Sequence, residues 1–210
     1  MDRCRSSLAA IVAAVIIGDT QQATSQPAAR SPIVVSVFDY ARVTPEDMAS
    51  ARAKVAAIFS RAGVHIVWSG PSSPAGGLDV APAACDQPFV VQVMIRPRRA
   101  DWTPQRKRVM GEALAADDAR AVLSLFYDAI FDIALRYGAS LDGILAVALA
   151  HEMGHSLLPP PAHSGTGLMQ ARWEGDDIRH AIGTVLEFDS QQADQIRAKA
   201  EQRCKPSRNP

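Results

Sequence analysis

The chain has few of the features that would define its class directly. It carries no excess charge, because 22 Lys and Arg residues balance 22 Asp and Glu residues among its 210 residues. It has three cysteines and no repeats, heptads or low-complexity tracts. A neutral chain lacks the net basic face that nucleic-acid binding requires, so we expect no nucleic-acid partner. The length is that of one ordinary domain with a sizeable core.

The N-terminal segment has the layout of a secretory signal peptide. Arg3 and Arg5 form a short basic start, residues 8–17 are apolar, and small residues at 23–25 supply a cleavage site. The apolar run is about half of the roughly 20 residues that a spanning helix needs, and nothing later could span a membrane. We therefore predict a signal peptide at residues 1–25 and one secreted or periplasmic domain at residues 26–210, without stable membrane insertion. An uncleaved N-terminal anchor is the alternative.

The cysteines agree with export. Residues 1–25 contain Cys4 with two of the 22 basic and two of the 22 acidic residues, so the mature chain stays neutral with 20 of each. Cys85 and Cys204 remain, and an oxidising compartment favours a disulfide between them over two free thiols. We interpret the basic cluster at residues 96–108 as a solvated loop and not as a patch that binds an acidic partner.

Apolar periodicity predicts an α/β (α+β) fold with a small twisted mixed sheet. Strand-like runs at residues 33–38 and 65–68 flank a helix between Thr44 and Gly63, an order typical of two parallel strands with a covering helix. Residues 69–88 are rich in Ser, Pro, Gly and Ala and should form a long loop. The remaining elements expected are strands at 89–95 and 121–127, the second running into a helix that ends at 137, a buried helix from 140, a helical turn at 176–181 and a terminal helix at 190–203.

The buried helix carries the sequence HEMGH, residues 151–155, at its C-terminal end. Residues four apart share one face of a helix, so His151 and His155 can reach one ion, with Glu152 beside them. A catalytic zinc ion lowers the pKa of its bound water to about 7, and a carboxylate directly after the first ligand can take the proton. The pattern therefore predicts a zinc site with Glu152 as general base.

A catalytic zinc ion needs a third protein ligand, for which the sequence offers two main candidates and a weaker one, His180. His163 follows His155 by eight residues, after three prolines and before a turn-forming stretch that ends at Met169. Glu174 follows His155 by nineteen residues, at a spacing that would suit the gluzincin arrangement. We favour His163, because Ser-x-x-Gly-x-Met follows it and no helix is evident around Glu174.

Residues 151–173 resemble the metzincin metallopeptidases, above all the matrixin-type pattern H-E-x-G-H-S-L-G-x-x-H-S followed by a Met-turn. They are also similar to small uncharacterised secreted bacterial proteins with H-E-x-G-H and a later H-S-x-x-G-x-M. The resemblance implies that His151, His155 and His163 bind zinc, that Glu152 is the general base and acid, and that Met169 is the structural methionine. It also implies a metzincin-like fold with a short C-terminal subdomain, and hydrolysis of a peptide or protein substrate.

Two departures from the family pattern concern the third ligand. The family's glycine is Leu158 here, and His163 comes twelve rather than ten residues after His151. A side chain in the left-handed region costs roughly 1–2 kcal/mol, so we expect Leu158 not to make the glycine's turn. The prolines would instead carry the chain about 9 Å before it returns. If the chain does not bring His163 back to the other two histidines, the protein would be a catalytically impaired zinc-binding or interaction protein, which is the alternative hypothesis.

Overall fold

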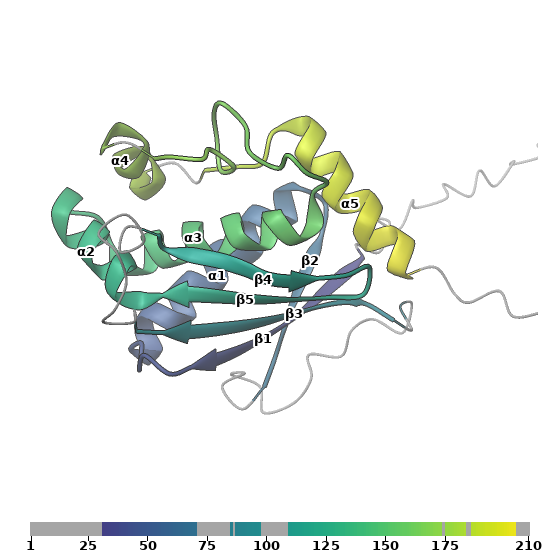
Figure 1. Cartoon of the computed structure of the whole chain (residues 1–210), viewed down its shortest axis with the longest axis horizontal. Helices are drawn as coiled ribbons and strands as arrows, with labels where there is room; N and C mark the ends of the chain where they lie inside the picture. The colour runs from purple at the N-terminus through teal and green to yellow at the C-terminus, as the bar shows by residue number, and fades with distance from the viewer. Residues whose placement is uncertain are drawn as a thin grey trace, which may run out of the picture.

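The computed structural model describes residues 31–70, 85, 87–97, 109–173, 175–183 and 186–204. Its central element is a five-stranded mixed sheet with the strand order β2-β1-β3-β5-β4 (Figure 1). The strands are β1 (Pro32–Asp39), β2 (His65–Ser69), β3 (Phe89–Arg96), β4 (Gly111–Ala116) and β5 (Arg120–Phe126). The first three and β5 are parallel, and β4 is antiparallel to β5 at one edge. The predicted mixed sheet and α/β class are confirmed.

One helix connects the first two strands, and the other described helices follow the last strand. They are α1 (Pro45–Arg61), α2 (Tyr127–Tyr137), α3 (Leu141–Leu157), α4 (Gly175–Gly183) and α5 (Ser190–Cys204). The helix α1 begins as predicted at Thr44, whose hydroxyl accepts a hydrogen bond from the backbone N–H of Asp47 at 3.1 Å. It ends before Gly63, whose φ of 81° turns the chain into β2.

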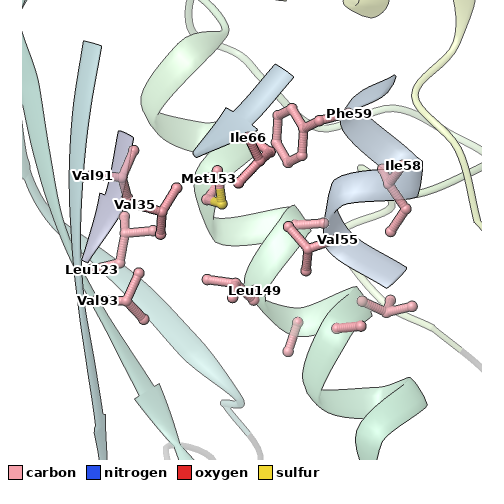
Figure 2. Close-up of a cluster of buried hydrophobic side chains, with 14 of the residues drawn as sticks. Val35, Val55, Ile58, Phe59, Ile66, Val91, Val93, Leu123, Leu149 and Met153 are labelled. Carbon is pink, nitrogen blue, oxygen red and sulfur yellow. The ribbon is translucent and has the colours of Figure 1, made fainter. Parts of the chain in front are cut away.

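The helices α1 and α3 pack side by side and cover one face of the sheet. Alternate side chains of β1 and β3 point into this layer and are buried, whereas most of those between them are partly or well exposed. Figure 2 shows the core between the two layers. Val35, Val91, Val93 and Leu123 of the sheet lie on one side, and residues of α3 and α1 lie on the other, with Ile66 of β2 next to Phe59; the labelled helix residues are Leu149, Met153, Val55, Ile58 and Phe59. The middle of α3 is therefore buried, as its apolar sequence predicts.

The strand β4 is an element that the sequence analysis misses. Its sequence, GEALAA, has no β-branched or aromatic residue, so strand propensity gives no signal. Pairing with β5 specifies it instead, with Gly111 opposite Leu125 and Ala113 opposite Leu123. The carbonyl of Met110 just before it accepts a hydrogen bond from the N–H of Phe126 at 2.8 Å. This antiparallel edge strand lies against α3 and therefore matters for the site.

A disulfide joins Cys85 to Cys204, which confirms the predicted pairing. It connects the segment before β3 to the last residue of α5, across 119 positions of sequence. The predicted signal peptide, most of the loop at residues 69–88 and most of the basic cluster at residues 96–108 lie outside the described residues. In the part of the chain that the structure describes, every helix is too short or too polar to cross a membrane.

Candidate metal centre

Three histidine side chains converge at the C-terminal end of α3. His151 and His155 lie one turn apart on the helix, and His163 comes from the loop that follows it. One ring nitrogen from each lies within 4.8 Å of the others, and the Nε2 atoms of His151 and His155 are 3.1 Å apart. Zn–N bonds of about 2.0–2.1 Å at tetrahedral angles place two ligand nitrogens about 3.3 Å apart. The three histidines are therefore close enough to bind one metal ion.

The ring of His151 is oriented by the turn around Leu168. Its Nδ1 lies 2.8 Å from the carbonyl oxygen of Leu168. A carbonyl only accepts hydrogen bonds, so Nδ1 carries the proton and the Nε2 lone pair faces the other histidines. The indole ring of Trp173 packs edge-on against the same imidazole at 5.2 Å between centroids. A backbone carbonyl on the second ring nitrogen is the usual support of a histidine ligand.

The electrostatics of the site keep two of the imidazoles neutral. Burial lowers the pKa of His151; the hydrogen bond to the carbonyl of Leu168 opposes this, and the nearby imidazole of His163 adds to it. Burial lowers the pKa of His155 to about 4, with contributions from His151 and His163. Neutral imidazole is the form that binds a metal ion, and three such nitrogens suit the borderline-soft zinc ion. The donor set therefore fits zinc.

Glu152 lies beneath the first residue of β4. Its side chain is 8% exposed. A Cβ atom placed on Gly111 would be only 2.6 Å from Cγ of Glu152 and 2.9 Å from its Oε1, so the carboxyl packs directly on the glycine backbone. Burial, with a smaller contribution from the negative charge of Glu112, raises the pKa of Glu152 to about 7. A carboxyl with a pKa near neutrality can both accept and return a proton at neutral pH.

The loop after α3 returns His163 to the helix. Leu158 has φ −93° and ψ 146°, so it is extended and does not make a left-handed turn, as expected. Its side chain is buried while the three prolines after it are exposed. The return is held where the backbone N–H of Ser164 donates to the carbonyl of Met169 at 2.9 Å, around Gly167 with φ 78°. The longer connection therefore still places His163 beside His155.

Met169 is fully buried against the helical turn that carries the two histidines. A Cβ atom on Gly154 would lie 2.4 Å from Sδ of Met169 and 3.0 Å from Cε1 of Phe188. Only a residue without a side chain allows this approach. Gly154 therefore sets the distance between α3 and the turn that contains Leu168 and Met169, and the sequence alone did not assign it this role.

The three histidines and Glu152 line an open cleft of about 1260 Å³. Its other walls come mainly from residues 109–113 at the start of β4, from α2 and from residues 170–173; they include Met110, Ala113, Ile133, Tyr137 and Trp173. Glu174, the rival third ligand, lies outside the described residues. The geometry thus brings together His151, Glu152, His155 and His163 and leaves the role of Glu174 as a prediction.

No protein-family model matches the chain, and no curated protein sequence matches it significantly. The resemblance to metzincins therefore rests on the sequence of residues 151–173 alone.

Proposed function

We propose that the protein is a secreted zinc metalloendopeptidase with a metzincin-like fold, which hydrolyses bonds of a peptide or protein substrate. The observation that carries this proposal is the buried carboxyl of Glu152, which lies next to two histidines of α3 and packs on the edge strand β4. The loop after α3 brings a third histidine, His163, close to the other two. The signal-peptide pattern and the disulfide support an extracellular or periplasmic location.

In this proposal His151, His155 and His163 hold the zinc ion. When bound, zinc supplies a Lewis acid that polarises the substrate carbonyl and lowers the pKa of water to about 7. A carboxylate oxygen of Glu152 accepts the proton of the attacking water and returns it to the nitrogen of the leaving amine. Burial of this carboxyl favours its protonated form, so it can hold the proton between the two transfers. The carbonyl of Leu168 keeps the ring of His151 oriented throughout.

The position of the edge strand β4 favours an extended peptide as the substrate. Its residues 111–113 line the cleft beside the histidines, and only one of its two sides pairs with a described strand. The backbone groups on the other side can pair with an added strand, which is how many proteins bind extended peptides. A peptide bound there would run past Glu152 and bring a backbone carbonyl to the metal centre.

The test compares the parent chain with Glu152→Gln on a library of internally quenched peptides. Both proteins are residues 26–210 loaded with zinc, and zinc per chain is measured in each. We expect the variant to keep its zinc and to lose at least about 100-fold in turnover, because general acid–base catalysis contributes about 10²–10⁴-fold. Equal turnover in both would exclude Glu152 as the base. A zinc-loaded parent that cleaves no peptide would favour the impaired zinc-binding protein instead.

A further inference from the structure

The C-terminal segment, residues 186–204, contacts the candidate metal centre at two separate points. At the first, the carbonyl of Glu187 accepts a hydrogen bond from the N–H of Leu168 at 3.0 Å. The carbonyl of the same Leu168 accepts the hydrogen bond from Nδ1 of His151. The side chain of Glu187 also forms a half-exposed ion pair with Arg61 of α1 at 3.0 Å. In this series of hydrogen bonds, Leu168 alone lies between Glu187 of the C-terminal segment and His151.

At the second point, Lys199 of α5 reaches the C-terminal end of α3, the helix that carries His151 and His155. Its Nζ donates a hydrogen bond to the carbonyl of Ser156 at 3.1 Å. Ser156 directly follows His155, and its carbonyl is one of the last four in α3, which have no partner within the helix. A positive charge at this end also interacts favourably with the helix dipole. The ammonium lies 5.2 Å from the ring centroid of Phe89 in β3, which helps to hold it in place.

The helix α5 is anchored along its whole length. At its start, Oδ1 of Asp189 accepts from the N–H of Gln192 at 2.8 Å, and Oε1 of Gln192 accepts from the N–H of Asp189 at 3.1 Å, a reciprocal cap. In its middle, Ile196 and Ala200 are completely buried. Its last residue, Cys204, carries the disulfide. Lys199 is therefore presented by a helix that is fixed on both sides of it.

We propose that Lys199 is a positioning residue of the metal centre and that the Cys85–Cys204 disulfide holds α5 so that Lys199 can act. The inference rests on the zinc site of the proposed function. The last turn of α3 carries His155 and leads into the loop of His163, so loosening this turn moves two ligands relative to His151. Partners that orient metal ligands typically change metal affinity by about 10–100-fold when removed. Lys199 acts through a backbone carbonyl, so a smaller change is expected.

The experiment measures the zinc dissociation constant by competition with a chromogenic chelator, and the absorption spectrum of the cobalt-loaded protein. Lys199→Met should weaken zinc binding about fivefold and alter the cobalt bands, because the geometry of two ligands changes. Lys199→Arg keeps a donor and a charge, so it should restore both. The matched control is Arg120→Met, which also removes one positive charge, at the exposed first residue of β5. The control should match the parent.

A second pair of variants tests the disulfide. The double variant Cys85→Ser/Cys204→Ser should also weaken zinc binding. Lys199→Met should then weaken zinc binding by less in this double variant than it does in the parent. Effects that act through one element are not additive. Full additivity would show that the disulfide does not act through Lys199.

The outcomes separate this inference from the proposed function. A parent that binds one zinc ion, with Lys199→Met binding it equally well and giving the same cobalt spectrum, would overturn the positioning role and leave the peptidase proposal intact. A parent that binds no zinc would remove the metal centre and both proposals with it.

Discussion

Replacing Glu152 with Gln should stabilise the metal-free protein at alkaline pH. The carboxyl is 8% exposed, and burial raises its pKa from an ordinary 4.5 to about 7. A group whose pKa is raised by folding contributes stability that is complete below the unfolded pKa and is lost as the pH rises through the folded pKa. At pH 8.5 the buried carboxylate should therefore destabilise the fold by about 3 kcal/mol, against less than about 1 kcal/mol at pH 5. The substituted glutamine carries no charge at either pH.

The assay is urea denaturation in EDTA at both pH values, followed by circular dichroism. Glu152→Gln should raise the free energy of unfolding by about 3 kcal/mol at pH 8.5 and change it little at pH 5. The lowered pKa values of His151 and His155 give an opposite pH trend, but it is common to parent and variant and cancels in the difference. Glu201→Gln, at an exposed position of α5, is the control and should show no such gain. A variant that gains no more at pH 8.5 than at pH 5 would refute the burial of a costly charge.

Three further predictions follow from close contacts in the site. Gly111→Ala places a Cβ against Glu152, so it should lower the free energy of unfolding by about 1–3 kcal/mol and reduce turnover without loss of zinc, measured by urea denaturation and peptide cleavage. Gly154→Ala should also destabilise by about 1–2 kcal/mol despite the better helix propensity of Ala, and Met169→Ala should relieve much of that loss in a double-mutant cycle. Zinc should change the tryptophan fluorescence of the parent, and Trp173→Phe should remove most of that change, because its indole packs against a ligand histidine.

Controls keep these predictions specific. Gly165→Ala, where a Cβ would meet nothing within 4 Å, should leave stability and turnover unchanged. If Gly111→Ala unfolds no more easily than Gly165→Ala, the close contact between Glu152 and Gly111 of β4 would be refuted. If Gly154→Ala and Met169→Ala are additive, the two residues do not determine one contact. A zinc response that survives in Trp173→Phe would place its origin at another tryptophan.

The sequence predicted those elements whose signals are local. The β-branched runs at residues 33–38 and 65–68, the cap at Thr44 and the stop at Gly63 each correspond to an observed boundary within a residue or two. The strand β4 could not be predicted, because its alanines and glycine have no strand preference and only pairing with β5 holds them extended. Because β4 has no signal in the sequence, one wall of the cleft could not be predicted either.

For the site, helical spacing was enough to place His151, Glu152 and His155 together, since four residues make about one turn. The position of His163 was not derivable, because it depends on how a loop of three prolines returns after Leu158. The contact of Gly154 with Met169 and that of Gly111 with Glu152 join residues 15 and 41 positions apart. Such contacts depend on tertiary packing and leave no periodic signal in the sequence.

The most direct test of the central claim is zinc per chain, measured by elemental mass spectrometry on purified residues 26–210 and on His163→Ala and Glu174→Ala. About one zinc ion in the parent and in Glu174→Ala, with a large loss in His163→Ala, is the result that the three-histidine site predicts. Zinc retained in His163→Ala but lost in Glu174→Ala would assign the third ligand to Glu174. No zinc in any of the three, under conditions that do not strip metal, would contradict the proposed metallopeptidase.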